Sequence, residues 1–194
     1  GKVVADTAEC CGWDSIEFFD DAWPAMTVNG AWSVVGSTTE LLERLTEFSG
    51  VIVAIGNNSI RLQKLQYLLE VRAPVVTLVH PSAYVSRHAR LEAGSVVFAG
   101  ANLNANAVIA TGTILNTGCS VDHDCVLDEA VHISPGAHLA GGVRVGARSW
   151  VGIGASIRQL TSIGENVIVG AGAVVVDHVP DGLVVAGVPA KRIR

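Results

Sequence analysis

The chain has 194 residues, a formal net charge of −5 at pH 7, 49% hydrophobic residues and 16% charged residues. This length suits one large or two small domains, and the composition is that of an ordinary globular protein. The acidic balance, with a pI near 5.6, argues against nucleic acid or an anionic membrane as the main partner. No apolar run reaches the length of a membrane span, and acidic residues recur through residues 1–30, so a cytoplasmic protein is expected.

Residues 1–78 alternate amphipathic segments with short apolar ones. Helices are expected over residues 2–11, 38–48 and 59–72, and strands over residues 15–19, 51–55 and 75–79. This alternation predicts a Rossmann-like βαβ domain with a small parallel sheet, whose first strand is missing because the chain starts at a helix. Ligands bind such sheets beyond the carboxyl ends of the strands, which here means Asp20-Asp21 and Gly56-Asn57.

Residues 79–194 follow a different rule, because an aliphatic residue recurs at every sixth position from Val79 to Val175. At a hydrophobic fraction of 49%, seventeen successive matches would arise by chance roughly five times in a million. A small residue, most often alanine, stands four places after nearly every aliphatic one. One branched and one small inward residue in each hexad suit short strands wound around a narrow prism. The sequence therefore predicts a left-handed parallel β-helix of hexapeptide repeats, ending in a basic tail.

The densest polar cluster of the array surrounds His123. Three hexads close one coil, and the same place one coil away holds Ala105 or Gly141, so the imidazole is expected beside open space. An isolated surface histidine usually has no function. The flanking Asp122 and Asp124, however, can fix its tautomer and keep it basic enough to act as a general base near neutral pH.

Histidines and cysteines also permit a metal or redox interpretation. His123, His132 and His138 are assigned to three different faces of the prism, so they could bind zinc only across an interface between chains. Cys119 and Cys125 fall on small inward positions and are interpreted as reduced thiols with a packing role. No metal site is expected within one chain.

Several motifs resemble those of one family, the sialic acid O-acetyltransferase/nucleotide-amino-sugar N-acetyltransferases. They are Asp20-Asp21, AIGNNSIR at 54–61, HPSA at 80–83, Asn116-Thr117, VDHDC at 121–125, HISPGA at 132–137 and GVPAK at 187–191. The resemblance covers essentially the whole chain. It implies a nucleotide-sugar-binding domain over residues 1–78, an acetyl-CoA-binding β-helix over residues 79–194, and a homotrimer with active sites between neighbouring β-helices.

The resemblance also assigns residues to roles, position by position. His123 is implied as the catalytic base and Asp124 as the acid that orients it. The acetyl-CoA contacts implied are His132, Gly141, Ile153 and Ala171. The sugar-nucleotide contacts implied are Asp20, Asp21, Gly56, Asn57, Ile60 and Asn116. The family's glycine-rich loop should precede Lys2, and only its last glycine, Gly1, is present.

The reaction implied is transfer of the acetyl group of acetyl-CoA to the 4-amino group of a nucleotide-linked 4-amino-4,6-dideoxy sugar, with a UDP-sugar as the first choice of partner. Three other functions stay open: O-acetylation of a sialic acid or another sugar, a metal-dependent β-helix protein of the carbonic-anhydrase type, and a non-catalytic trimeric scaffold. Exposed apolar side chains such as Phe98 and Trp150 favour a trimer, because packing around a three-fold axis would cover them.

Overall fold

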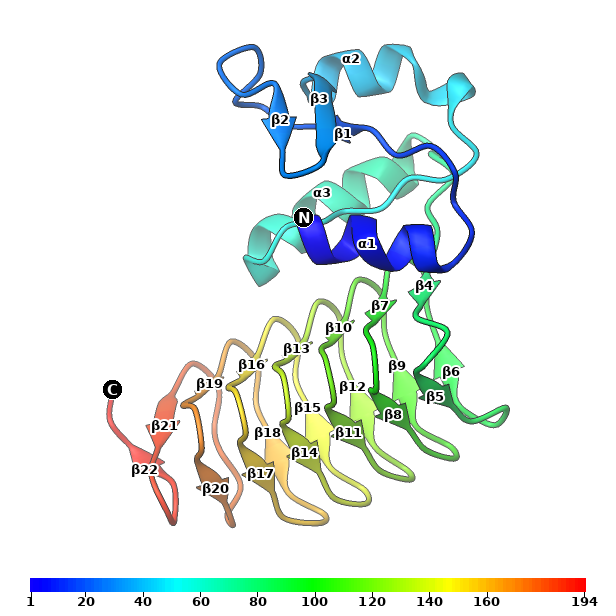
Figure 1. Cartoon of the computed structure of the whole chain (residues 1–194). Helices are drawn as coiled ribbons and strands as arrows, with labels where there is room; N and C mark the ends of the chain where they lie inside the picture. Colours follow the sequence, from blue (N-terminus) through cyan, green and yellow to red (C-terminus); the bar gives the residue numbers. More distant parts are fainter.

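The computed structural model describes all residues, 1–194, and shows a small N-terminal region beside one face of a long β-helix (Figure 1). The N-terminal elements are α1 (Lys2–Cys10), β1 (Phe18–Phe19), β2 (Val28–Asn29), β3 (Trp32–Gly36), α2 (Thr38–Glu43), the 3-10 helix η1 (Leu45–Glu47) and α3 (Asn58–Glu70). The three helices that the sequence predicts are therefore present, although α2 is shorter than expected. None of the helices has the length and apolar character that crossing a membrane requires.

The N-terminal sheet differs from the predicted one. Its order is β1-β3-β2, in which β1 pairs with β3 in parallel and β2 pairs with β3 antiparallel. Neither β2 nor β3 was predicted from the sequence. The predicted strands 51–55 and 75–79 form only an isolated bridge between Val51 and Val75, and the end of the second belongs to the β-helix. Residues 51–55 are apolar because Val51 and Val53 pack under α3 with Leu65 and Leu68, which requires burial but no ladder.

The β-helix consists of three parallel sheets, one for each face of a prism, and each coil contributes one strand to each sheet. The first face contains β4 (Leu78–Val79), β7 (Val96–Val97), β10 (Ile114–Leu115), β13 (His132–Ile133), β16 (Trp150–Val151), β19 (Ile168–Val169), β21 (Val184–Ala186) and the antiparallel β22 (Lys191–Arg192). The second face contains β5 (Tyr84–Val85), β8 (Asn102–Leu103), β11 (Ser120–Val121), β14 (His138–Leu139), β17 (Ser156–Ile157) and β20 (Val174–Val175). The third face contains β6 (Arg90–Leu91), β9 (Val108–Ile109), β12 (Val126–Leu127), β15 (Arg144–Val145) and β18 (Ser162–Ile163).

The hexad pattern matches this architecture residue by residue. Each recurring aliphatic residue is the second residue of a strand from β4 to β20, and pairing such as Ile114 with His132 joins residues eighteen apart. The aliphatic side chains from Val97 onward and the small residues between them form one continuous buried core. Burying each branched side chain contributes about 1.5–3 kcal/mol to folding stability, so each coil is stabilised by packing on its neighbouring coils.

The N-terminal region covers the first coils of the first face. Val4 and Ala8 of α1 pack on Leu78, Val96 and Ile114, the outward residues of β4, β7 and β10. Phe98 joins this contact and is only 5% exposed. The expectation that Phe98 lies exposed and needs a neighbouring chain is therefore wrong, because the chain's own first helix covers it. Trp150, farther along the same face, is 41% exposed.

Candidate active site

His123 lies in the turn between β11 and β12, at the corner where the second face meets the third. The side chain of Asp122 accepts a hydrogen bond from the His123 backbone N–H at 2.8 Å and another from Asn104 Nδ2 at 3.1 Å. Asp124 has a φ of 60°, in the left-handed region that aspartate tolerates better than most residues. Asp122 therefore fixes the backbone at His123, and Asp124 follows in a left-handed turn.

The imidazole and the Asp124 carboxylate form a direct pair. His123 Nδ1 lies 2.7 Å from Asp124 Oδ2, and Asn106 Nδ2 donates to the other carboxylate oxygen at 3.2 Å. Because the Nδ1–H group donates its hydrogen bond to the carboxylate, Nε2 is left as the proton acceptor. The hydrogen bond to Asp124, followed by the charge of Asp122, raises the pKa of His123 above its ordinary value. Hydrogen bonds from His123 and Asn106 lower the pKa of Asp124.

Gly141 leaves the space in which His123 lies. A Cβ atom built on Gly141 would be 2.6 Å from both Cε1 and Nε2 of the imidazole, far inside van der Waals contact. The turn below is tied to the same residue, because the Gly142 N–H donates to the His123 carbonyl at 2.9 Å. The expected open place one coil from His123 is therefore present at Gly141, and the imidazole occupies it in part.

His132 lies in a different environment, on the first face. It is 8% exposed and stacks on Trp150 with ring centroids 4.9 Å apart. Its Nε2 lies 3.1 Å from Asn116 Nδ2, while its Nδ1 is buried without a hydrogen-bond partner. Burial, and then the positive charge of Arg61, lowers the pKa of His132 to about 4. His132 is therefore neutral at physiological pH.

The four expected acetyl-CoA contacts occupy separate parts of one chain. His132 is on the first face, and Gly141 is at the corner between the second and third faces. Ile153 and Ala171 lie at the corner between the first and second faces, on consecutive coils joined by the hydrogen bond from Gly172 N to Ile153 O at 2.7 Å. Ile153 is 62% exposed. A single chain therefore does not gather the four residues around one ligand.

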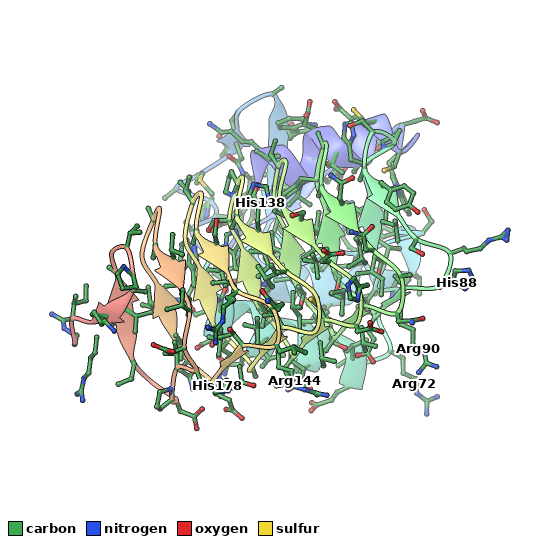
Figure 2. All side chains as sticks on the ribbon, turned by 90° about the horizontal axis from the view of Figure 1, so that it is seen from below. Arg72, His88, Arg90, His138, Arg144 and His178 are labelled. Atoms are coloured by element: carbon green, nitrogen blue, oxygen red, sulfur yellow. The ribbon has the colours of Figure 1, made fainter.

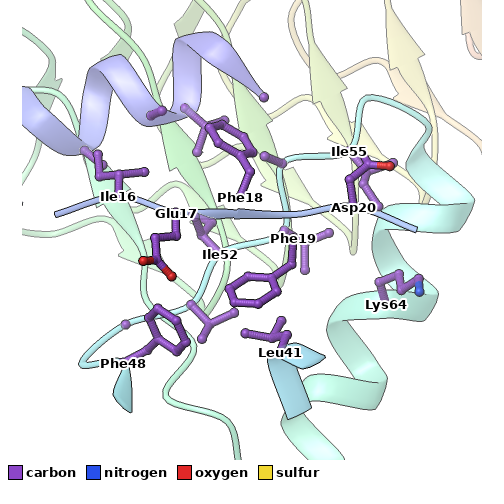
Figure 3. A pocket seen from close by; sticks show the side chains of 18 of the residues that line it. Ile16, Glu17, Phe18, Phe19, Asp20, Leu41, Phe48, Ile52, Ile55 and Lys64 are labelled. Atoms are coloured by element: carbon purple, nitrogen blue, oxygen red, sulfur yellow. The ribbon is translucent and has the colours of Figure 1, made fainter. Parts of the chain in front are cut away.

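The N-terminal region contains a cavity of about 440 Å³, which has mainly apolar walls. Figure 3 shows Phe19, Phe48 and Leu41 along one side of it, with Asp20 and Lys64 nearby. Of the expected sugar-nucleotide contacts, Asp20, Asp21 and Ile60 line this cavity.

Asp21 has partners within the chain. It accepts hydrogen bonds from the Thr38 backbone N–H and from Lys64 Nζ, each at 2.9 Å. These contacts hold the pKa of Asp21 well below its usual range. Asp20 accepts from the Ala22 N–H at 2.9 Å. Contacts within the chain therefore hold both side chains at the edge of the cavity, and the Asp21 carboxylate is ionised at neutral pH.

The other expected sugar-nucleotide contacts lie elsewhere. Gly56 and Asn116 line a smaller cavity of about 150 Å³ together with Arg61 and His132. Asn57 is the N-cap of α3, and its Oδ1 accepts from the Ile60 N–H at 3.0 Å. The structure thus divides the expected set between two cavities and a helix cap.

Sequence reasoning missed Asn106 and Arg61. Asn106 stands eighteen residues before Asp124 and shares its backbone conformation, with a φ of 61°, so the coil period itself could have indicated the contact. Arg61 lies on the face of α3 that carries Leu62, Leu65 and Leu68. A charged residue at the spacing of a buried face was the signal in that case.

The histidines form no metal cluster. The structure contains no group of three or more His, Cys, Asp or Glu side chains arranged to hold a metal ion. The assignment of His138 to a separate face from His123 is wrong: His138 is on β14, in the same sheet as β11, and its Nδ1 lies 2.8 Å from Ser120 Oγ. Figure 2 shows His138 apart from His88 and His178. Cys119 and Cys125 are fully buried, and burial raises their thiol pKa values to about 12 and about 11.

Comparison with known proteins gives a consistent result. Residues 1–68 match the family model described as the PglD N-terminal domain. The acetyltransferase domain of PglB from Neisseria gonorrhoeae is 44% identical, with a TM-score of 0.93 over 99% of this chain and 94% of that chain. The structure of PerB from Caulobacter crescentus in complex with CoA and GDP-perosamine is 38% identical, with a TM-score of 0.94 over 100% of this chain and 92% of that chain.

Among curated proteins the match is shorter. A putative lipopolysaccharide biosynthesis O-acetyl transferase of Escherichia coli, WbbJ, is 44% identical over 50 residues, which is 26% of this chain and 26% of that protein. The hexad coils and the solved relatives define an acetyltransferase of the β-helix class. More narrowly, the chain belongs to the nucleotide-amino-sugar N-acetyltransferase family, as the motifs in its sequence indicated.

Proposed function

We propose that this chain transfers the acetyl group of acetyl-CoA to the 4-amino group of a nucleotide-linked 4-amino-4,6-dideoxy sugar. The observation that carries the proposal is the His123–Asp124 pair, with Nδ1 held by the carboxylate at 2.7 Å and Nε2 lying over Gly141. The solved relatives support the substrates. One structure of the PglB domain holds acetyl coenzyme A, and the PerB structure holds CoA and GDP-perosamine.

The chemistry follows from the free Nε2. An uncharged amine attacks the thioester carbon, and His123 Nε2 takes the proton that the nitrogen loses as the C–N bond forms. When the tetrahedral intermediate collapses, the C–S bond breaks and the proton passes to the thiolate of CoA. The backbone N–H of Gly141 makes no hydrogen bond within the chain, so it is free to donate to the oxyanion. The buried Cys119 and Cys125 thiols are excluded as nucleophiles by their inward position.

The placement of the two substrates supports an assembly of several chains. The N-terminal cavity lies above the first face, whereas His123 lies at the corner opposite that face. A sugar nucleotide held in the cavity of one chain therefore meets the His123 of another chain. A homotrimer of left-handed β-helices, with the residues before the array holding the nucleotide and the coils holding acetyl-CoA, satisfies this requirement.

The test is an acetyl-transfer assay with acetyl-CoA and a panel of UDP-, GDP- and dTDP-linked 4-amino sugars, with release of free CoA thiol and product mass as readouts. We expect one acetyl group to be added to the amino sugar and none to the matching 4-hydroxy sugar. Failure to acetylate any amino sugar, by a protein that binds CoA, would remove the proposal.

O-acetylation of a sugar is the second candidate, favoured by the match over 50 residues to a putative O-acetyl transferase. A hydroxyl is a weaker nucleophile than an amine and requires more of the base. The same panel decides between the two, because the 4-hydroxy sugars would then be the better acceptors.

A further inference from the structure

Arg61 is the most buried charged residue of the molecule, at 1% exposure, and no carboxylate pairs with it. Its Nε donates to the Gly112 carbonyl at 2.8 Å, and its Nη2 donates to the Ala130 carbonyl at 2.8 Å. Both acceptors lie in turns of the β-helix, on consecutive coils. Arg61 itself is on α3 of the N-terminal region. The guanidinium therefore joins the two parts of the chain.

A third coil is joined by the neighbouring Asn58. Its Nδ2 donates to the Arg148 carbonyl at 2.9 Å, and its Oδ1 accepts from Arg61 Nη2 at 2.8 Å. Gly112, Ala130 and Arg148 are eighteen residues apart and stack at one corner of the prism. The two side chains thus donate hydrogen bonds to the backbone carbonyls of three successive coils at one corner. We call Arg61 and Asn58 the interdomain clamp.

The other side of the guanidinium holds the loop before α3. Arg61 Nη1 donates to the Ile55 carbonyl at 3.0 Å and to the Gly56 carbonyl at 3.1 Å. With these contacts all five N–H groups of Arg61 are used. The loop contains Gly56 and Asn57, two of the residues implied to contact the sugar nucleotide. One side chain therefore fixes this loop relative to the coils that carry Asn116 and His132, the other polar residues of the smaller cavity.

The chemistry of this site requires arginine. A buried cation without a counter-ion is costly, and burial lowers the pKa of Arg61 to about 10, which still leaves it charged at neutral pH. Only the planar guanidinium fork can donate to the loop on one side and to two coils on the other. A lysine would keep the charge but offers three donors from a single atom.

We propose that Arg61 and Asn58 are positioning residues, which hold the 55–58 loop against the β-helix and so set where the nucleotide sugar lies relative to the acetyl-transfer site. The inference rests on the proposed function for its kinetic consequence, although the structural role of the clamp does not depend on it.

The main experiment compares Arg61→Lys with Arg72→Lys, an exposed arginine just beyond α3. Amide hydrogen exchange in the full-length protein should be about tenfold faster or more over residues 55–58 in Arg61→Lys, because each lost hydrogen bond to a charged donor is worth about that factor. The KM for the amino-sugar nucleotide should rise by about tenfold, while the KM for acetyl-CoA changes less than about twofold. Arg72→Lys should behave as wild type in both.

Two variants together separate the charge of Arg61 from its hydrogen bonds. Arg61→Met removes the charge and the hydrogen bonds, so the NMR titration midpoint of His132 should move upward. Arg61→Lys keeps the charge, so it should leave that midpoint low. Should Arg61 variants fail to fold, Asn58→Ala keeps the guanidinium and removes the link to Arg148, and it should still accelerate exchange of the loop.

Two outcomes would overturn the clamp: unchanged loop exchange in folded Arg61→Lys or Asn58→Ala, or an equal rise of both KM values. If the wild type acetylates no amino sugar and the exchange result still holds, the proposed function fails and the clamp stands. The two failures are therefore distinguishable.

Discussion

At the scale of single residues, the proposed chemistry depends on His123. Replacing it with alanine should lower kcat by about two to four orders of magnitude, the range typical for loss of a general base, while CoA still binds. His138→Ala is the matched control, since that histidine is also exposed but its imidazole is hydrogen-bonded to the Ser120 hydroxyl and not to a carboxylate. The measurement is steady-state kinetics with an amino-sugar acceptor. Near-normal turnover of His123→Ala would show that another group is the base.

The contact between His123 and Asp124 predicts a pH effect. The base must be unprotonated to act, so kcat/KM should rise with pH through the pKa of His123, which Asp124 and Asp122 hold above the ordinary value of 6.5. Asp124→Asn removes one charge and should move this midpoint to lower pH, with a smaller loss of kcat than His123→Ala. A titration of kcat/KM with one acceptor for both proteins tests this. A midpoint unchanged or higher in Asp124→Asn would contradict the assignment.

His132 predicts the pH dependence of stability. Its pKa in the folded state is about 4, below the unfolded value of about 6.5. The unfolded state therefore binds more protons between these values, and stability falls as the pH falls through this window. From pH 7 to pH 5 the free energy of unfolding should drop by about 2 kcal/mol more in the wild type than in His132→Phe. Urea unfolding at fixed protein concentration measures this, and parallel pH curves would refute it.

At the scale of elements, the sequence predicted best where one rule governs many residues. The seventeen aliphatic hexad positions of residues 79–175 all became the second residue of a strand, because a narrow prism accepts only branched and small residues inward. The N-terminal sheet was predicted poorly. Residues 51–55 are apolar enough for a buried strand, but they satisfy that requirement by packing under α3, and β3 was not recognised. The burial of a segment can be predicted from its own apolar residues, whereas the pairing of a strand depends on partners that are distant in the sequence.

Gly141 lies in the turn between β14 and β15, next to His123, and gives a separate prediction. A side chain there would meet the His123 ring at 2.6 Å, so Gly141→Val should displace the imidazole and obstruct the approach of the thioester. We expect a large loss of kcat and a raised KM for acetyl-CoA, with the KM for the sugar nucleotide nearly unchanged. An unaffected Gly141→Val enzyme would show that the thioester approaches from elsewhere.

At the scale of the whole molecule, the candidate site could be predicted only in pieces. The pair of His123 and Asp124 is local in sequence, so adjacent residues sufficed to find it. The relation between that pair and the N-terminal cavity is global, and the structure shows them on opposite sides of the prism. The covering of Phe98 by α1 belongs to the same scale, since no period within the hexads indicates which face the N-terminal region occupies.

This separation yields the last prediction, which concerns assembly. If each site combines the cavity of one chain with the His123 of its neighbour, two inactive variants should restore each other. His123→Ala lacks the base, and Ile60→Glu places a carboxylate at the wall of the cavity, where it should repel the phosphates of the nucleotide. In trimers formed at random from equal amounts of the two co-expressed chains, about a quarter of the sites would combine an intact cavity with an intact histidine. Activity near a quarter of the wild-type value is therefore expected, in a species whose mass by light scattering is that of a trimer. A mixture as inactive as its components would place both halves of the site in the same chain, and a monomer mass would exclude the shared site altogether.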